Sequence, residues 1–407
     1  MKCRFCESPL SQTFVDLGMQ PLSNAYVATD SANGSEIFYP LHARVCGRCH
    51  LVQIPQLELP ENIFANYAYL SSVSESWLEH CKCYAIEVAA RFQLGASSSV
   101  VEVASNDGYL LRFFQGQGIP VLGIEPADNV ADIAIHAGVP TMVRFFGSAV
   151  AEELVASGTR ADLLIGNNVL AHVPDLNDFV RGLRILLAPN GVITMEFPHL
   201  SRLIEQRQFD TIYHEHFSYF SLFTAMQIFA AHGITIFDVD ELPTHGGSLR
   251  IYGCHAAQLR GRSKRVDAVL ANEEEQRLLT VDPYALFAER VRDAKRKLLE
   301  FFIPKRRAGC HVVAYGAAAK GNTLLNYCGM RTDFIDYVVD RNPIKQGKLL
   351  PGTHIPIMAP ERIRETRPEW ILVLPWNLRS EIANQLAFVK EWGCQLVVPI
   401  PDIEVLA

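Results

Sequence analysis

The sequence lacks the basic excess and the long apolar runs that would mark a nucleic-acid-binding or membrane protein. Its 37 lysine and arginine residues are outnumbered by 44 aspartate and glutamate residues, which gives a formal net charge of −7 and a pI near 6.0. Proteins that neutralise phosphates along a nucleic acid usually carry the opposite balance. No apolar run approaches the roughly eighteen residues of a membrane span, and MKCRFCESPL at the start has no apolar signal core. We therefore expect a cytoplasmic monomer or weak homo-oligomer without nucleic-acid or membrane partners.

Two nucleotide-binding fingerprints are also missing, the dinucleotide motif G-x-G-x-x-G and the P-loop motif G-x4-G-K-[ST]. What is present is a globular composition, with 49% hydrophobic and 20% charged residues. A chain of 407 residues is long enough for two or three domains of ordinary size.

Two pairs of cysteines near the start have the spacing of a zinc site. Cys3 and Cys6 form one C-x2-C, and Cys46 and Cys49 form another. Two such turns supply the four thiolates that structural zinc prefers. A redox pair is the alternative, but redox C-x-x-C motifs open a helix after a strand and seldom come in twos. We expect a structural zinc ion with all four positions filled, so that it performs no chemistry.

From residue 99 the chain alternates apolar strands with helical stretches, which predicts a doubly wound, mainly parallel sheet. SVVEVASNDGYLLRFF is a strand, a polar turn and a helix, and the next strand ends in Glu125, a carboxylate that can accept both hydroxyls of a ribose. Ala104, Ser105 and Asn106 stand where a dinucleotide loop has glycines, so the pattern favours S-adenosylmethionine. The alternative is a tight turn in a sheet without a cofactor. The candidate cofactor-binding residues are Glu102, Ala104, Asn106, Gly108, Glu125, Pro126 and Asn167.

The C-terminal third repeats this pattern after a charged amphipathic helix, expected as a linker over about residues 282–302. CHVVAYGAAAKGNTLLNYCG again reads as strand, loop and helix, a second strand ends in Asp340, and WILVLPWN is a third. The repeated pattern indicates a duplication. In the C-terminal third it predicts a degenerate cofactor site that has become adapted to the substrate, in preference to a second full cofactor site.

The stretch FDTIYHEHFSYFS places Tyr213, His214, Glu215 and His216 in consecutive positions. A metal site is one interpretation, although no third ligand is evident nearby. A surface loop is another, although the flanking aromatic residues indicate burial. An acid/base site is favoured, because a neutral imidazole is a natural base near physiological pH and a neighbouring phenol or carboxylate can orient it.

Taken together, the motifs resemble a known family, the nucleotide-sugar C-methyltransferases of deoxysugar biosynthesis, over essentially the whole chain. The resemblance rests on the first C-x2-C, NYAYLSSVSESW, EVASNDGYLL, NNVLAHVPD, YHEH, HGGSLR and GAAAKGNTLLN. It implies an enzyme that uses S-adenosylmethionine to methylate C3 or C5 of a dTDP-linked 4-keto-6-deoxy sugar. It also implies an α/β protein with a small zinc-binding domain (residues 1–65), a central class I, Rossmann-like methyltransferase domain (66–265) and a C-terminal Rossmann-like domain that assists substrate binding (266–407).

By this resemblance His216 is the catalytic base, with Tyr213 and Glu215 as its close partners. Asn168 and His172 follow the strand ADLLI, so we expect them at its carboxyl end, beside the methyl donor. Asn168 would bind the enolate oxygen or the cofactor, and His172 would contact the keto group. The alternative for both is a capping role between strand and helix.

The substrate's diphosphate needs hydrogen-bond donors, which hydroxyls and N–H groups at a helix start supply. NYAYLSSVSESW provides them, and a hydroxyl-rich capping turn is its alternative reading. His245 heads a glycine turn and would line the pocket or only stabilise that turn. The candidate substrate-binding residues are Tyr67, Tyr69, Ser71, His245 and Lys320.

Three other functions compete with this interpretation. An RNA methyltransferase with an N-terminal zinc module would need a basic groove, and lysine and arginine clusters are scarce. A non-catalytic nucleotide-sugar-binding protein would be indicated by loss of His216 or Glu125, and both are present. A hydride-transferring epimerase or dehydratase would need the dinucleotide glycines and a Y-x3-K pair in the expected place.

Overall fold

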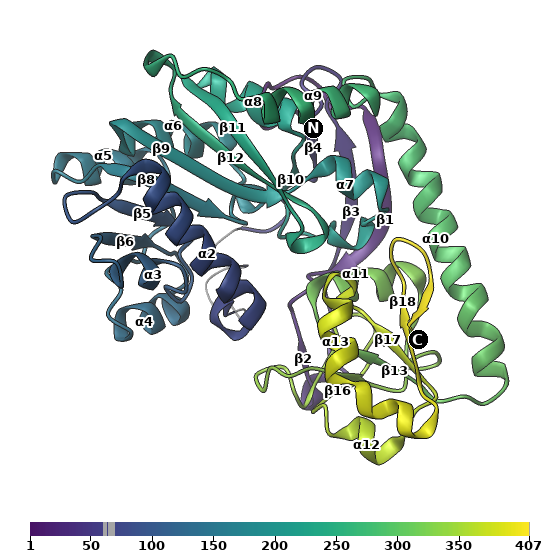
Figure 1. Ribbon diagram of the computed structural model, residues 1–407. Coiled ribbons are helices and arrows are strands. Elements are labelled where there is room, and N and C mark those ends of the chain that lie inside the picture. The colour runs from purple at the N-terminus through teal and green to yellow at the C-terminus, as the bar shows by residue number, and fades with distance from the viewer. Residues whose placement is uncertain (60–62, 64–69, 407) are drawn as a thin grey trace.

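The computed structural model describes residues 1–59, 63 and 70–406, and three large sheets dominate it (Figure 1). The chain starts in a small antiparallel sheet, continues through a seven-stranded sheet with helices on both faces, and ends in a six-stranded, mainly parallel sheet. None of the helices in the described part of the chain is long and apolar enough to cross a membrane. The predicted mixed α/β class, with two Rossmann-like sheets, is confirmed.

The N-terminal sheet is antiparallel and takes its last strand from far along the chain. In spatial order its strands are β1 (Gln12–Pro21), β3 (Phe38–Val45), β4 (Val52–Gln53) and β10 (Ser218–Tyr219). The helix expected over residues 282–302 is α10 (Asp282–Arg307), and it packs along this sheet (Figure 1). Phe287 of α10 stacks on Phe14 of β1 with ring centroids 4.4 Å apart, so the helix is part of the core as well as a connection.

The central sheet has the strand order β11-β12-β9-β8-β5-β6-β7, in which β12 runs antiparallel to both neighbours. Its strands are β5 (Val100–Val103), β6 (Val121–Ile124), β7 (Thr141–Met142), β8 (Ala161–Asn167), β9 (Leu187–Pro198), β11 (Ile234–Leu242) and β12 (Ser248–His255). All four residues of β5 are buried, as expected for a strand covered on both faces.

Helices cover both faces of the central sheet. One apolar cluster joins the sheet to α2 (Glu75–Phe92) and α3 (Leu111–Gln115). Another joins it to α5 (Ser148–Ala156), α6 (Leu176–Leu186) and α8 (Leu222–Ala231), and also takes in three of the zinc-type cysteines. The cysteine site therefore packs directly on the central sheet.

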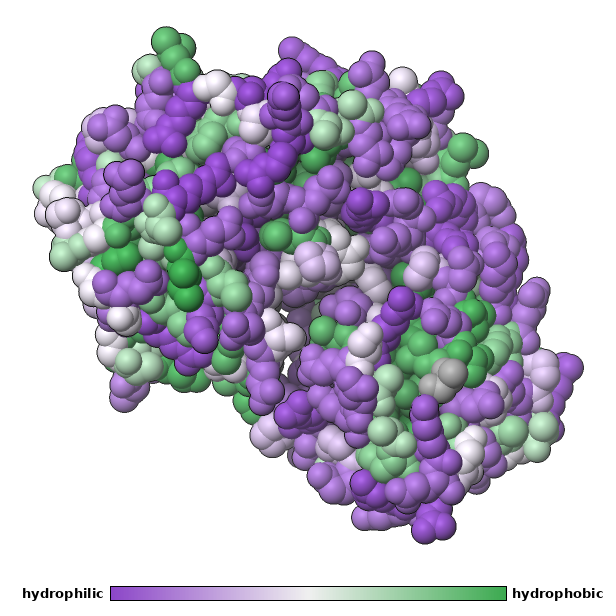
Figure 2. Space-filling model, viewed as in Figure 1, coloured by the Kyte–Doolittle hydropathy of each residue, from purple (hydrophilic) through white to green (hydrophobic). Residues whose placement is uncertain are grey.

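The C-terminal sheet has the strand order β16-β14-β13-β17-β18-β19, and only β19 is antiparallel to its neighbour. Its strands are β13 (Val312–Tyr315), β14 (Val338–Val339), β16 (Ile357–Met358), β17 (Trp370–Val373), β18 (Gln395–Val398) and β19 (Glu404–Leu406). One apolar core runs from this sheet through α10 into the N-terminal sheet. A short ribbon of β2 (Val27–Ala28) and β15 (Lys348–Leu349) also joins the two ends of the chain. Figure 2 shows a hollow between the central sheet's lobe and the C-terminal lobe.

Candidate active site

The four predicted zinc ligands come together at the base of the N-terminal sheet. The sulfurs of Cys3, Cys6, Cys46 and Cys49 all lie within 4.8 Å of one another. The Arg48 backbone N–H donates to the Cys46 sulfur at 3.4 Å, and the side-chain amide of Gln53 donates to the Cys3 sulfur at 3.2 Å. Donors aimed at sulfur favour thiolates, and four thiolates in this arrangement fit a tetrahedral zinc ion without an open position.

The loop after β5 folds tightly under the end of β6. Its residues Ala104, Asn106 and Gly108 have positive φ angles of 56°, 50° and 74°. The Glu125 carboxylate accepts the backbone N–H groups of Asn106 and Ala127, both at 2.9 Å. Burial raises the pKa of Glu125. Each carboxylate oxygen keeps a second lone pair, so Glu125 can hold the loop and still accept a ribose hydroxyl.

In the part of the chain that the structure describes, four buried acceptors in this loop and in the neighbouring strands β5 and β8 or just after them have no hydrogen-bond partner. They are Oε2 of Glu102, Oδ1 of Asp107, Oδ1 of Asn167 and Oδ1 of Asn168. Burying a polar atom without a hydrogen bond costs about 1–3 kcal/mol, so such a group of acceptors indicates a polar ligand with several donors. The ammonium and ribose hydroxyls of S-adenosylmethionine provide such donors. The residues present therefore fit this cofactor.

The structure adds two details to the strand, polar turn and helix that the sequence predicts here. A Cβ atom on Gly108 would lie 2.9 Å from Cγ2 of Val139, so this glycine allows close packing against the chain before β7. The predicted helix is only α3, Leu111–Gln115, and it starts three residues after Gly108. The backbone next to Gly108 is therefore that of the loop and not that of a helix N-terminus.

Of the three residues predicted to bind the phosphates through hydroxyls, the structure describes only Ser71. Tyr67 and Tyr69 lie outside the described residues. Ser71 is buried in the short helix η2 (Ser71–Val73), and its backbone N–H donates to Oδ1 of Asn106 at 2.9 Å. The next N–H, of Ser72, donates to Asp107 at 3.2 Å. Ser71 thus supports the cofactor loop, because its N–H group is already used there.

The YHEH stretch forms a buried β-turn, so the surface-loop interpretation was wrong. The His216 N–H donates to the Tyr213 carbonyl at 2.9 Å, which closes the turn. The Tyr213 hydroxyl then lies 2.9 Å from Nε2 of His216, and Nδ1 of His216 lies 2.9 Å from the Thr211 carbonyl. A carbonyl only accepts, so Nδ1 carries the proton and Nε2 offers its lone pair. Burial, assisted by the neighbouring His172, holds the pKa of His216 well below its usual value, so the ring is neutral.

His172 packs against His216 with ring centroids 4.7 Å apart. Its Nδ1 lies 2.8 Å from the Glu215 carbonyl, so Nδ1 carries the proton. Burial lowers the pKa of His172 to about 4. In this neutral tautomer Nε2 is an acceptor. The Glu215 carbonyl therefore takes the ring's N–H group, and the contact of His172 with a keto group stays a prediction.

Glu215 does not partner His216 through its side chain, contrary to expectation. Its carboxylate accepts the side-chain amide of Asn24 at 2.7 Å, from the segment that follows β1. Burial raises the pKa of Glu215 to about 7. The turn directs the two side chains to different partners, and the ring of His214 takes a third direction, edge-on against Tyr39 at 5.7 Å.

Asn168 directly follows β8 and has a positive φ of 53°. Its amide nitrogen lies 3.2 Å from Nε2 of His245, so these two predicted residues meet. His245 also has a positive φ, 55°, within the short helix η5 (Thr244–Gly246). A non-glycine residue in this conformation is strained and persists only where its surroundings fix it.

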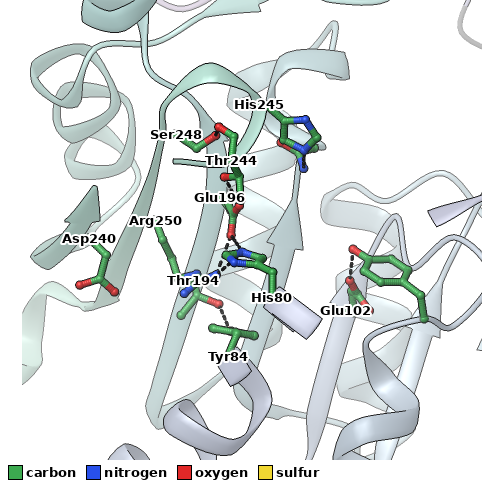
Figure 3. Close-up of polar contacts among 12 residues, drawn as sticks. His80, Tyr84, Glu102, Thr194, Glu196, Asp240, Thr244, His245, Ser248 and Arg250 are labelled. Atoms are coloured by element: carbon green, nitrogen blue, oxygen red, sulfur yellow. Dashed lines mark hydrogen bonds and ion pairs between the residues drawn. The ribbon is translucent and has the colours of Figure 1, made fainter. Parts of the chain in front are cut away.

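A buried ion pair fixes that turn, and the sequence analysis missed it (Figure 3). Glu196, near the end of β9, accepts from Arg250 at 2.7 Å and from the Thr244 hydroxyl at 2.9 Å, and lies 3.0 Å from Nε2 of His80. Burial alone would raise the pKa of Glu196, but His80 and Arg250 hold it at about 2. A carboxylate at a strand's carboxyl end, in the stretch MEFP, is the signal that could have revealed this residue.

Lys320 reaches the same region from the C-terminal sheet. It lies in the first turn of α11 (Ala319–Cys328), where a loop position was expected. Its ammonium binds the side-chain oxygen of Asn377 and lies 4.5 Å from the Trp376 ring centre. The Trp376 indole donates to buried Asp210 at 2.7 Å. Burial lowers the pKa of Lys320 to about 8, and the charge of Asp210 opposes that shift.

Comparison with known proteins covers the chain in three consecutive parts. Residues 3–64 match a family model for a zinc-binding domain, 77–239 a methyltransferase domain and 243–401 a C-methyltransferase C-terminal domain. The C-methyltransferase NovU of Streptomyces niveus is 35% identical, over 100% of this chain and 97% of its own.

Two similar solved structures each cover less than half of the chain. One is the magnesium protoporphyrin IX methyltransferase ChlM of Synechocystis PCC 6803 with bound SAH, at 14% identity and a TM-score of 0.35, covering 44% of this chain and 83% of its own. Another is the PH0226 protein of Pyrococcus horikoshii OT3, at 13% identity and a TM-score of 0.37, covering 48% and 97%. On the full-length match to NovU and the three family models, the chain belongs to the S-adenosylmethionine-dependent C-methyltransferases with an N-terminal zinc-binding domain.

Proposed function

We propose that this C-methyltransferase acts on a nucleotide-linked 4-keto-6-deoxy sugar, dTDP-linked by family preference, at C3 or C5. The observation that carries the proposal is the Tyr213–His216 pair, with 2.9 Å between the hydroxyl and Nε2 of a neutral, buried imidazole. A carbon next to a ketone is acidic enough for such a base to deprotonate it when the enolate oxygen is stabilised. A carbon nucleophile is what C-methylation requires.

His216 is the proposed base. Its Nδ1–H group is held by the Thr211 carbonyl, which keeps Nε2 unprotonated and orients the ring. On substrate binding, the Tyr213 hydroxyl turns from Nε2 to the keto oxygen, and Nε2 receives the proton from the adjacent sugar carbon. The electron pair of that C–H bond moves into the enolate, whose oxygen Tyr213 then stabilises.

Glu102, Asp107, Glu125 and Asn167 would hold S-adenosylmethionine through the acceptors described above. The cofactor, when bound, supplies the electrophilic methyl group. The amide nitrogen of Asn168 lies 3.2 Å from Nε2 of His245, and its side-chain oxygen is buried without a partner among the described residues, so it can accept from a ligand. It would therefore fix the distance between the cofactor and the sugar.

The sugar nucleotide would enter between the central and C-terminal sheets, where Figure 2 shows a hollow. Lys320 is protonated at neutral pH, since its pKa is about 8, and it is the proposed cation for the diphosphate. His245 would line the sugar pocket, with its strained turn fixed by Glu196.

The test is incubation with S-adenosylmethionine and a dTDP-4-keto-6-deoxyhexose in deuterated water, followed by mass spectrometry and NMR. We expect a new methyl group on one carbon. His216→Asn should retain its cofactor affinity in calorimetry and lose both methylation and deuterium exchange by about 10²–10⁴-fold. His136→Asn, at an exposed histidine of α4 (Asp128–His136), is the matched control and should behave as wild type.

Near-wild-type exchange in His216→Asn would remove this residue from the base role. Neither methylation nor exchange in the wild-type protein with cofactor bound would exclude this sugar class as substrate. Because the same reaction mixture reports both signals, failure of the base assignment and failure of the substrate assignment give different results.

A further inference from the structure

Arg4 lies inside the first zinc turn (residues 3–6), and its side chain points away from the sulfurs into the central part of the protein. Its guanidinium donates to the carbonyls of Val173 and Pro174, at 3.5 and 3.2 Å, and to the carbonyl of Ile54 at 2.6 Å. Val173 and Pro174 directly follow His172. The side chain of Arg4 in the zinc turn thus forms hydrogen bonds with the segment that carries this active-site histidine.

The same arginine reaches the segment that follows His216. Ile54 donates its N–H to the carbonyl of Phe217 at 3.0 Å, and the Arg4 guanidinium lies 5.3 Å from the centre of the Phe217 ring. Phe217 in turn donates its N–H to the carbonyl of Ala171 at 2.7 Å. Arg4, Ile54 and Phe217 therefore form one connected set of contacts that ends beside both histidines.

The backbone of the zinc site continues this connection. β4 starts three residues after Cys49 and pairs with β10, which starts two residues after His216. Gln53 of β4 donates to the Cys3 sulfur and accepts the Arg4 backbone N–H at 2.9 Å. The second zinc turn is therefore next to the stretch FDTIYHEHFSYFS, called the base segment from here on, through paired strands of one sheet. Arg4 adds a side-chain contact between the zinc turns and this segment.

The charge of Arg4 suits this place. A zinc ion with four thiolates carries a net charge of −2, and the Arg4 guanidinium is positively charged at neutral pH. A partly buried charge needs compensation, and the zinc cluster can provide it, while three backbone carbonyls accept from the two terminal guanidinium nitrogens. A lysine would supply one ammonium group in place of this planar fork.

We propose that Arg4 is a positioning residue for catalysis, which fastens the first zinc turn to the segments carrying His172 and His216. The inference rests on the proposed function, in which His216 is the base. It gives the zinc domain a part in turnover: the domain sets the place of the base, although the metal performs no chemistry. A displacement of about 1 Å at a base can cost about 10²-fold in rate, so loss of the Arg4 contacts should lower the rate of the reaction.

The test compares Arg4→Met and Arg4→Lys with Arg48→Met, a matched control at an exposed arginine of the second zinc turn (residues 46–49). Five quantities are measured on the full-length protein: zinc content, S-adenosylmethionine affinity, KM for the sugar nucleotide, the rate of deuterium exchange and the rate of methylation. For Arg4→Met we expect unchanged zinc content, cofactor affinity and KM, with exchange and kcat lowered together by about 10–100-fold. Arg4→Lys should recover part of that loss, and Arg48→Met should match the wild type.

Wild-type exchange and kcat in Arg4→Met would overturn the proposal. So would loss of zinc, or cofactor affinity that falls in proportion to kcat, because either result would make Arg4 a residue of general structural support. His216→Asn in the same assay separates the two proposals. If that variant exchanges normally, the base assignment has failed; if it is inactive while Arg4→Met is unaffected, only the positioning role has failed.

Discussion

The ammonium group of Lys320 makes the pH dependence of the enzyme predictable. Burial lowers its pKa to about 8, so the group is charged at neutral pH and loses its proton as the pH rises through 8. At one pH unit above the pKa, about one tenth of the free enzyme keeps the charge. If this charge binds the substrate diphosphate, kcat/KM should fall about tenfold between pH 7 and pH 9.

The assay is a set of initial methylation rates at low sugar-nucleotide concentration from pH 6.5 to 9.5, because kcat/KM reports ionisation of the free enzyme. Saturating substrate should flatten the alkaline decline, since a bound diphosphate stabilises the ammonium and raises its pKa. Lys320→Arg keeps a charge that does not titrate in this range, so its profile should stay level above pH 8. Lys348→Arg, on β15, changes a lysine in the two-stranded ribbon and should retain the wild-type decline.

The decisive comparison is between the two arginine variants. An alkaline decline near pH 8 that survives in Lys320→Arg would show that another group controls it, and the reasoning from burial would be refuted. A decline that disappears in both variants would equally refute the assignment, because Lys348 has no place in the proposed site.

Two further predictions concern the Tyr213–His216 pair and the short helix that carries His245. Tyr213→Phe removes the hydroxyl 2.9 Å from Nε2 of His216 and should lower kcat by about tenfold or more, with the S-adenosylmethionine affinity from calorimetry unchanged; an unchanged kcat would contradict the enolate role of Tyr213. Gly246→Ala places a Cβ atom 2.5 Å from the Trp376 ring at a φ of +93°, and should lower the free energy of unfolding in urea by about 2–5 kcal/mol. Gly261→Ala, whose added Cβ meets nothing within 4 Å, is its control, and equal losses in the two variants would contradict the packing argument.

The parts of the site that depend on local spacing were predictable from the sequence. Two C-x2-C pairs specify two tight turns, and four sulfurs within 4.8 Å follow from them once the turns meet. Parallel strands bring their carboxyl ends to one edge, so Glu125 after β6 and Asn168 after β8 were expected beside a ligand from pattern alone. In both cases the position of the side chain depends on only a few neighbouring residues in the sequence.

The parts that depend on long-range contacts were not predictable. Glu215 binds Asn24, 191 residues away, and nothing in the stretch YHEH reveals that partner. The tautomer of His172 depends on a carbonyl 43 residues further along the chain, which the motif NNVLAHVPD does not reveal. Asp210, Trp376 and Lys320 likewise meet only because the C-terminal sheet folds back on the base segment.

The base segment explains why a methyltransferase sheet would be flanked by two other sheets. It lies between β9 and β11, a region of the central sheet's chain that leaves the sheet for residues 199–233. A long excursion of this kind does not by itself hold an imidazole to within a fraction of an ångström. Here β10 pairs it with the N-terminal sheet, and Asp210 binds Trp376 of the C-terminal part. A carbon acid needs a fixed base, and in the proposed mechanism the two added sheets hold the segment that carries it.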